Sequence, residues 1–352
     1  MRRYLVTGAA GFIGSSFVEQ LLLGSEARVV VLDAMTYAGH QANLDQATAR
    51  ARHEGRLSRH YEFVHGSICD RPLLTALFER EQFDVVVNFA AESHVDRSIE
   101  SAGEFVETNV MGVFSLLDAS LRAWSDRTPE EKSEFRFIQV STDEVFGQLG
   151  ETGAFTELTA YAPSSPYSAS KAGGDHLARA WNHTFQLPVI VTNCSNNYGP
   201  RQFPEKLIPH MINCALSGKP LPVYGTGHNV RDWIHVSDHC HGIMLAIEKG
   251  LPGESYCFGG RSERRNLNVV EAICDELDRV RPRTDGKSYR EQITFVEDRK
   301  GHDWRYAIDD AKAENELGFK RQFTSFEDGL KTTVGWYLSN QEWMQTVLGR
   351  KA

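Results

Sequence analysis

The sequence predicts an α/β fold, a doubly wound parallel sheet with a smaller, mixed α/β domain beside it. Short apolar runs rich in β-branched residues alternate with segments of helical periodicity, and a glycine-rich turn follows the first run. After about residue 193 the alternation gives way to an irregular pattern with many Pro and Gly residues. Strands separated by helices pair in parallel through right-handed crossovers, and 352 residues are enough for two domains.

The predicted strands are the apolar runs 4–7, 29–32, 62–64, 85–89, 135–140 and 189–192. Helical spacing predicts a long helix over 103–124 and further helices over 266–280 and 324–340. The polar, charged segments 124–134 and 281–292 are expected to be loops.

Composition limits the function classes. A net charge of −9 argues against a nucleic-acid surface and against anionic membranes. No run of 18 apolar residues is present, and glycines break the apolar stretch near the start, so neither a membrane span nor a signal peptide is expected. Six scattered cysteines without a CxxC pair indicate reduced thiols, and the expected location is the cytoplasm.

The first chemical motif is "VTGAAGFIG", in which Gly8, Gly11 and Gly14 follow the first strand and open the first helix. Glycines there allow a tight turn and let a pyrophosphate approach the free amides of the helix N-terminus. Asp33 ends the second strand, where an acid binds a ribose 2′-hydroxyl and repels a 2′-phosphate. The motif predicts a Rossmann domain that binds NAD; the alternative is a glycine turn that only packs helix on strand, with Asp33 as a cap.

The second motif is "YSASK", which places Tyr167 and Lys171 four residues apart on one helix face. An ammonium beside a phenol favours the phenolate, so the tyrosine can act as a base. Thr142, at the end of the fifth predicted strand, supplies the hydroxyl that such a tyrosine needs as a partner. Together with the glycine turn, these residues indicate a short-chain dehydrogenase/reductase.

Two adjacent acids, Asp143 and Glu144, follow the same strand in "VSTDEVFG". Carboxylates next to a buried strand cost desolvation energy unless they are paired or used. An acid and a base that act on neighbouring carbons need close carboxyls with different pKa values. The alternative is that the two acids cap the following turn.

Longer stretches resemble the extended short-chain dehydrogenases/reductases that act on nucleotide sugars, and among them the dTDP-glucose 4,6-dehydratases. The resemblance runs nearly end to end. It rests on "DAMTYAG", "FAAESHVDRSI", "STDEVFG", "PSSPYSASKA", "NCSNNYGP", "FPEKLIP", "LPVYGTGHNVRDWIHVSDH" and "GHDWRYAID". It implies a nucleotide-sugar substrate and a tightly bound NAD that is regenerated in each turnover.

The resemblance also implies a reaction sequence. Tyr167, helped by Lys171, takes the C4 hydroxyl proton while the C4 hydride passes to NAD, and Thr142 bonds the C4 oxygen. Glu144 then removes the C5 proton and Asp143 protonates the departing C6 hydroxyl. The hydride finally returns to C6.

Further site residues are implied by the resemblance. The additional NAD-site residues are Phe12, Ile13, Ala34, Thr36, Ser67, Ile68, Ala90, Ala91, Thr108 and Asn197. The substrate-site residues are Ser93, Thr142, Asn196, Lys206, Leu207, Pro222, Tyr224, Arg231, Asn266, Asp298 and His302. The NAD-binding domain is expected to span 1–192 plus about 232–258, and the nucleotide-sugar domain 193–231 and 259–352. A homodimer is expected through the helices 103–124 and 167–185.

The chain departs from the family pattern at Arg261, Ser262, Lys300 and Trp304, near the expected sugar pocket, and at Ser67 and Phe146. The same chemistry on a UDP-, CDP- or GDP-linked hexose, including an N-acetylated one, is therefore an alternative. An epimerase or decarboxylase would use the Tyr/Lys pair without the acid pair, and a non-catalytic NAD-binding protein would need neither.

One further spacing could suggest a metal. His235 and His239 stand four residues apart, as zinc ligands often do. The expected chemistry needs no metal ion, so ordinary core or surface histidines are favoured and no metal site is expected.

Overall fold

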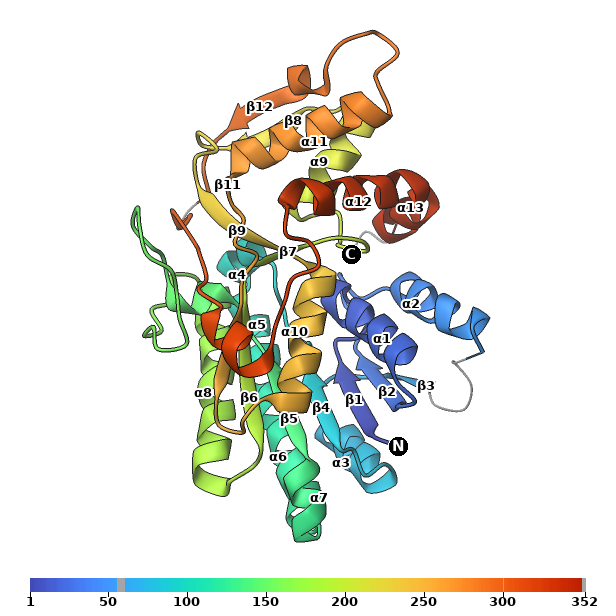
Figure 1. Cartoon of the computed structure of the whole chain (residues 1–352), viewed down its shortest axis with the longest axis vertical. Coiled ribbons are helices and arrows are strands. Elements are labelled where there is room, and N and C mark those ends of the chain that lie inside the picture. Colours follow the sequence, from blue (N-terminus) through green and yellow to red (C-terminus); the bar gives the residue numbers. More distant parts are fainter. Residues whose placement is uncertain (56–60, 300, 350–352) are drawn as a thin grey trace.

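The computed structural model describes residues 1–55, 61–299 and 301–349. Its main sheet has seven parallel strands in the order β10-β6-β5-β4-β1-β2-β3 (Figure 1). The strands are β1 (Arg3–Thr7), β2 (Arg28–Asp33), β3 (Tyr61–His65), β4 (Val85–Asn88), β5 (Arg136–Val140), β6 (Val189–Cys194) and β10 (Ser255–Phe258). The order reverses between β1 and β4, so ligands are expected at the carboxyl ends of these strands.

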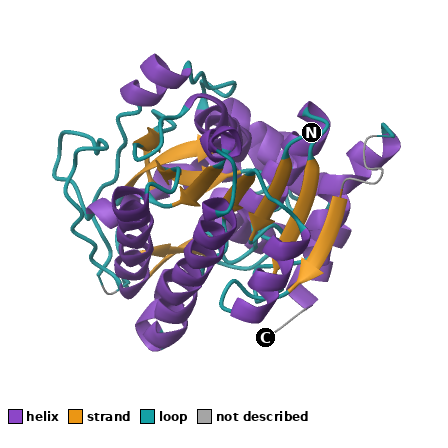
Figure 2. Ribbon diagram, turned by 90° about the horizontal axis from the view of Figure 1, so that it is seen from below, coloured by secondary structure: helices purple, strands orange, loops and turns teal. Residues whose placement is uncertain are grey.

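Helices cover both faces of this sheet (Figure 2). One face packs against α1 (Phe12–Gly24) and α10 (Val236–Lys249), with α2 (Gln41–His53) beside α1. The other face packs against α3 (Arg71–Arg80), α6 (Val113–Ser125) and α8 (Pro166–Phe185). Because the central strands are buried on both sides, they read as continuous apolar runs.

A smaller domain lies above the carboxyl edge of the sheet in Figure 1. It has a three-stranded sheet, β11-β9-β7, and a parallel pair, β12-β8. The strands are β7 (Asn196–Tyr198), β8 (Leu221–Tyr224), β9 (Val230–His235), β11 (Glu263–Arg265) and β12 (Ile293–Val296). The helices of this domain are α9 (Leu207–Leu216), α11 (Asn266–Val280), α12 (Phe326–Ser339) and α13 (Gln341–Gly349).

The two parts are joined by contacts across the chain. Trp343 of α13 donates from Nε1 to Oδ1 of Asn43 at 2.9 Å, which fixes the C-terminal helix to α2. Buried Arg201 forms an ion pair with Glu19 of α1. Within the described residues, no helix has both the length and the apolar character needed to cross a membrane.

The predicted α/β fold and its six strands are confirmed, with strand ends shifted by one or two residues. The seventh strand β10 and the helices α9 and α10 were not predicted. The segment predicted as a helix over 103–124 is α5 (Ala102–Val106), a π-helical turn η1 (Glu107–Gly112) and α6 in succession.

The prediction that 124–134 is entirely loop is wrong. Residues Pro129–Glu134 form the helix α7, which begins at a capping box. Thr128 accepts from the amide of Glu131 while the Glu131 carboxylate accepts from the amide of Thr128. The pattern T-x-x-E with proline at the first helical position outweighs the polarity of the segment.

Candidate active site

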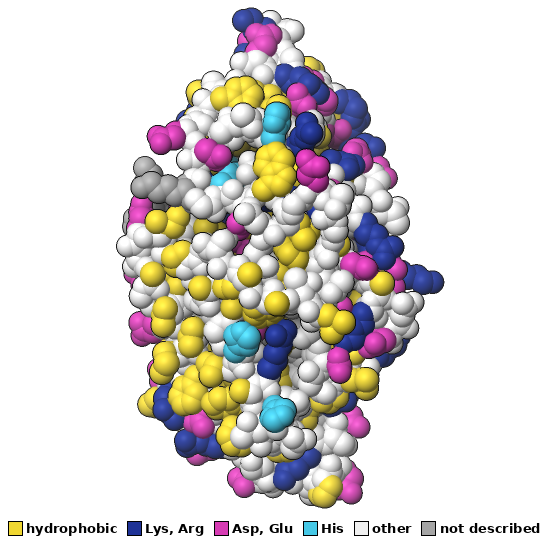
Figure 3. Space-filling view, turned by 90° about the vertical axis from the view of Figure 1, so that its left-hand side faces the viewer, with side chains coloured by type: hydrophobic (Ala, Val, Ile, Leu, Met, Phe, Trp, Pro, Cys, Tyr) yellow, Lys and Arg dark blue, Asp and Glu magenta, His cyan; other side chains and the backbone are white. Residues whose placement is uncertain are grey.

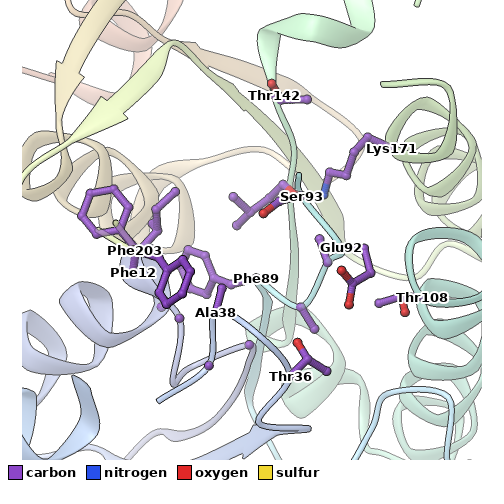
Figure 4. Close-up of a pocket in the computed structure, with 18 of the residues that line it drawn as sticks. Phe12, Thr36, Ala38, Phe89, Glu92, Ser93, Thr108, Thr142, Lys171 and Phe203 are labelled. Carbon is purple, nitrogen blue, oxygen red and sulfur yellow. Dashed lines mark hydrogen bonds between the residues drawn. The ribbon is translucent and has the colours of Figure 1, made fainter. Parts of the chain in front are cut away.

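A cleft with a cavity volume of about 350 Å³ lies at the carboxyl ends of β1, β2, β4, β5 and β6 (Figure 4). All the residues predicted for catalysis and for the NAD site line it. Of the predicted substrate residues, Ser93, Thr142, Asn196 and Lys206 line it as well. The cleft therefore joins the glycine turn, the acid pair and the Tyr/Lys pair.

The glycine turn has no room for side chains. Gly8 has φ +65°, and a Cβ there would lie 2.5 Å from the amide nitrogen of Ala90. A Cβ on Gly14 would lie 2.3 Å from the carbonyl oxygen of Gly8. No side chain caps the α1 N-terminus at Gly11, so the dipole and amides of the first turn favour an anion. This cradle fits a dinucleotide pyrophosphate.

Asp33 is buried at the end of β2. Its Oδ2 accepts from the amide of Ala10 at 2.8 Å, and its Oδ1 accepts from the amide of Met35 at 2.7 Å. Burial raises the pKa of Asp33 and the two amides oppose that rise. A carboxylate has about four acceptor sites, so sites remain for ribose hydroxyls. The geometry fits NAD, because a 2′-phosphate would meet a buried negative charge.

The 3₁₀ turn η2 (Asp143–Phe146) brings the two acids into the cleft. Thr142 caps this turn: its Oγ1 accepts from the amide of Glu144 at 3.2 Å and donates to Oδ1 of Asp143 at 3.3 Å. Asn193 of β6 donates to the Thr142 carbonyl at 3.0 Å. Within a strand, adjacent side chains would point to opposite faces, and the turn removes that restriction.

The acids differ in their surroundings. Asp143 is 2% exposed, and its Oδ2 has no hydrogen-bond partner among the described residues. Burial raises the pKa of Asp143, and the negative charges of Glu144 and Asp232 raise it further. Burial also raises the pKa of Glu144, but nearby cations, Arg231 first, oppose the rise. This contrast suits Asp143 as a proton donor and Glu144 as a base.

Tyr167 and Lys171 reach the cleft from α8, whose start is fixed by a capping box at Ser165. The Lys171 amine points toward the pocket in Figure 4 and donates to the carbonyl of Val140 at 2.7 Å. Burial raises the pKa of Tyr167, as does Glu144, while a hydrogen bond with Thr142 lowers it. Burial lowers the pKa of Lys171, and Asp175 opposes that change.

The other predicted substrate residues do not line this cleft but belong to the smaller domain. Leu207 opens α9 directly after Lys206, and Pro222 and Tyr224 lie on β8. The ring of His302 lies 6.4 Å from that of Tyr224, and Nδ1 of His302 lies 2.7 Å from Oδ1 of Asp298. Tyr224, Asp298 and His302 form a second polar group, at the ends of β8 and β12.

Arg231 connects the two groups. It lies on β9, opposite Arg264 of β11, and the predicted residue Asn266 begins α11 just beyond. Its guanidinium stacks on the Tyr306 ring at 4.2 Å and donates to the carbonyl of Asp303 at 2.9 Å. The same cation opposes the rise in the pKa of both acids, so it lies within electrostatic reach of the cleft.

Two of the departures from the family pattern, Arg261 and Ser262, make local contacts in this structure. Arg261 forms ion pairs with Asp310 and Glu314 and does not line the cleft. The Ser262 amide donates to Asp232 at 2.6 Å, and Trp304 is exposed at the surface. Lys300 lies outside the described residues.

The histidine pair makes hydrogen bonds. Nδ1 of His235 lies 2.7 Å from Oγ of Ser237, and Nδ1 of His239 lies 3.0 Å from Oδ1 of Asn197. Burial lowers the pKa of His235 to about 4 and that of His239 to about 3. Across 1–55, 61–299 and 301–349, no three His, Cys, Asp or Glu side chains gather as metal ligands would.

Several lining residues were not predicted. Figure 4 shows Phe203 beside Phe12, and Glu92 facing Thr108. Phe203 stacks on His40 with ring centres 5.5 Å apart. Tyr37, Cys194 and Glu205 line the cleft too. All five fall inside or next to the quoted motif stretches, so the signal was their position beside predicted site residues.

Known proteins resemble the chain along nearly its whole length. Residues 5–333 match the family described as GDP-mannose 4,6 dehydratase. A dTDP-glucose 4,6-dehydratase of Xanthomonas campestris is 55% identical over 348 residues, covering 99% of this chain and 96% of the relative. The dTDP-glucose 4,6-dehydratase 1 of Escherichia coli K12 is 50% identical, and the match covers 98% of this chain and 95% of the relative.

Solved structures of related enzymes resemble the chain over the same length. The dTDP-glucose 4,6-dehydratase DesIV of Streptomyces venezuelae, with NAD and TYD bound, superposes with a TM-score of 0.87 at 45% identity, covering 98% of this chain and 99% of that one. A UDP-glucose 4-epimerase of Thermotoga maritima superposes with a TM-score of 0.82 at 26% identity, and the match covers 96% of this chain and 99% of the epimerase.

Proposed function

The chain belongs to the nucleotide-sugar 4,6-dehydratase family, and from that premise we propose that it converts dTDP-glucose to dTDP-4-keto-6-deoxyglucose. It is an NAD-dependent hydro-lyase with a short-chain dehydrogenase/reductase fold. The observation that carries the proposal is the acid pair of buried Asp143 and partly buried Glu144, with different electrostatic surroundings, in one cleft with Tyr167. Identity to the dTDP-glucose dehydratases is about twice that to the epimerase.

The glycine turn, Asp33 and the other residues predicted for the NAD site would hold NAD in the cleft. When bound there, it would supply the redox chemistry, as acceptor of the C4 hydride and later as donor of the same hydride to C6. Because the hydride is returned, no external oxidant is consumed and the cofactor can stay bound.

Tyr167 takes the proton of the C4 hydroxyl while the C4–H bond of the hexose breaks. Lys171 stabilises the phenolate that makes this transfer possible, and the Thr142 hydroxyl donates to the C4 oxygen as it becomes a ketone. The burial of all three side chains excludes water and strengthens these interactions.

Glu144 and Asp143 carry out the elimination. The C4 ketone makes the C5 proton acidic, Glu144 removes it, and the C6–O bond breaks as Asp143 protonates the leaving hydroxyl. Water departs, and Glu144 returns its proton to C5 when the hydride reaches C6. The C4 hydroxyl proton held by Tyr167 then replaces, through solvent, the proton that Asp143 gave to the water, so both groups are restored. The general base must be ionised and the general acid protonated at the same pH, which the differing surroundings of the two acids support.

Lys206 and Arg231 are the cations proposed to bind the diphosphate, with Tyr224, Asn266 and His302 near the nucleotide. Lys206 donates to the carbonyl of Ser93 at 3.0 Å at the rim of the cleft. In a chain of net charge −9, a dianionic ligand needs such local cations.

The test is to incubate the purified protein, with no added NAD, against a panel of dTDP-, UDP-, CDP- and GDP-hexoses and to follow product mass. Loss of one water from dTDP-glucose supports the proposal. Loss of water only from another donor would reassign the substrate and keep the mechanism. Unchanged mass from every donor would favour an epimerase. The double variant Asp143→Asn/Glu144→Gln is the matched control, and it should bind the nucleotide sugar without releasing water.

We further propose that two copies associate through the α5–η1–α6 segment and α8. Apolar side chains gather over the lower half of the face in Figure 3, on the α8 side of the molecule. Val106 and Met111 are each about half exposed, and Phe185 at the end of α8 is 44% exposed. Light scattering should give twice the chain mass for the parent and the single chain mass for Met111→Glu; an unchanged dimer in the variant would reject this surface.

A cytoplasmic location stays a prediction, supported by six free cysteines.

A further inference from the structure

One buried carboxylate beside the Tyr/Lys pair has no role in the reaction above. Asp175 lies on α8, four residues after Lys171 and eight after Tyr167, and so on the same face of the helix. It is 0% exposed and does not line the cleft, so it cannot touch a substrate. Any effect it has on the chemistry must pass through its neighbours.

The contacts of Asp175 favour its ionised form. Its Oδ2 accepts from Oγ of Ser141 at 2.5 Å and from the hydroxyl of Tyr161 at 2.9 Å. The Tyr161 oxygen itself accepts from Arg179 at 2.9 Å, which directs the tyrosine proton toward Asp175. Oδ1 has no hydrogen-bond partner within the described part of the chain. Two donors and a nearby lysine suit a carboxylate better than a carboxylic acid.

We propose that Asp175 is a positioning residue that keeps Lys171 protonated and anchors the Ser141 end of β5, so that Thr142 and Tyr167 face the same substrate oxygen. The first half rests on the placement of the two side chains, since Asp175 lies one helical turn beyond Lys171 on the same face of α8 and both are buried. The second rests on the hydrogen bond to Ser141, the residue directly before Thr142. The catalytic part of this inference depends on the proposed function, whereas the charge pairing does not.

The groups that face Lys171 come from three elements. The Val140 carbonyl of β5 accepts a hydrogen bond from the Lys171 amine, Cys194 of β6 lies nearby, and Asp175 is on the same helix as Lys171. Among the described residues, Asp175 is the carboxylate that raises the pKa of Lys171 against the lowering effect of burial. Without it the amine would lose its proton at lower pH, and a neutral amine does not stabilise the Tyr167 phenolate.

The groups that face Asp175 are Lys171 and Arg179 on α8, Ser141 at the end of β5, and Tyr161 in the loop before α8. Burial raises the pKa of Asp175, and all four neighbours oppose that rise. Removing the charge while keeping the shape therefore tests the counter-charge alone.

The first experiment compares the parent with Asp175→Asn, as full chains with their bound cofactor, in kcat and KM for dTDP-glucose across pH. We expect kcat to fall about tenfold or more with KM within about twofold, and the alkaline limb of the kcat profile to move about one unit or more to lower pH. Tyr161→Phe is the matched control, since it removes one hydrogen bond to Asp175 but leaves the charge. Its alkaline limb should stay at the parental pH. If the alkaline limb of Asp175→Asn lies at the same pH as that of the parent, the proposal is overturned.

A second measurement does not need activity. Thermal unfolding is compared for Lys171→Met, Asp175→Asn and the double variant. Each single change leaves a buried group without its counter-charge. The fall in melting temperature of the double variant should therefore be smaller than the sum of the falls in the two single variants. Additive losses would overturn the pairing. If the parent turns over no nucleotide hexose, the proposed function fails, while this cycle still decides whether Asp175 and Lys171 are coupled.

Discussion

Replacing Asp143 with Asn should make the protein more stable and nearly inactive. Asp143 is 2% exposed, its Oδ2 has no partner among the described residues, and Glu144 and Asp232 place negative charge nearby. The asparagine keeps the shape and can still accept from Thr142, but it carries no charge. Functional sites commonly hold such costly groups because the chemistry needs them.

The size of the gain can be bounded. Asparagine leaves its side-chain nitrogen in the place of Oδ2, so the cost of one buried polar atom without a partner, about 1–3 kcal/mol, is common to both chains and drops out of the difference. Holding a carboxyl of ordinary pKa, about 3.9, in its protonated form at pH 7 costs about 4 kcal/mol, which sets the upper limit. A gain of up to about 4 kcal/mol corresponds to a rise in melting temperature of up to about 5 °C, because 352 residues at about 2.1 cal/mol/K each give an unfolding entropy of about 0.74 kcal/mol/K.

The assay is thermal unfolding of the cofactor-bound parent, Asp143→Asn and the exposed control Glu151→Gln at several pH values. Because burial and like charges raise the folded-state pKa of Asp143, the native state binds its proton more tightly than the unfolded chain does. The penalty is therefore absent below the unfolded pKa and grows as the pH rises through the folded one. The advantage of Asp143→Asn should be greatest near neutral pH and shrink toward pH 4. A variant less stable than the parent, or an advantage independent of pH, would show that the buried Asp143 carboxyl does not destabilise the fold.

Three further predictions concern the cofactor and the base. Gly14→Ala should be purified with far less NAD per chain than Gly103→Ala, because its Cβ would lie 2.3 Å from a backbone oxygen whereas that of Gly103 meets no described atom within 4 Å; equal cofactor contents would contradict the cradle. Asp33→Asn should weaken NAD binding about tenfold or more, since one of its two amide partners loses an acceptor at a cost of about 1–3 kcal/mol; titration of the cofactor-free protein measures this, and parental affinity would count against it. Tyr167→Phe should lower kcat by about a hundredfold or more while the affinity for dTDP, measured by calorimetry, stays within about twofold; a parental kcat would remove Tyr167 from the mechanism.

Local patterns were enough to predict the parts of the site that one segment builds. The spacing of the glycines and of Asp33 follows from the strand–turn–helix unit itself, and Tyr167 and Lys171 share a helix face by periodicity alone. The adjacent acids were visible because charge directly after a buried strand needs a reason.

What tertiary structure brings together could not be predicted from the sequence. The stacking of Arg231 on Tyr306 joins segments 75 residues apart, and the contact of Asp175 with Ser141 joins a helix to the end of a strand. The strand β10 is four residues long and pairs with β6, so its assignment depends on its partner. Arg261 has a positive φ and is directed to Asp310 and Glu314, which no local pattern encodes.

The central claim is that oxidation at C4 and reduction at C6 use the same hydride. The most direct measurement is to supply dTDP-glucose carrying deuterium at C4 to the purified protein, with no added NAD, and to locate the label by NMR and mass spectrometry. If the hydride is retained, the product has lost one water and carries the deuterium at C6. Deuterium retained at C4 without loss of water, or its replacement by solvent hydrogen, would contradict it.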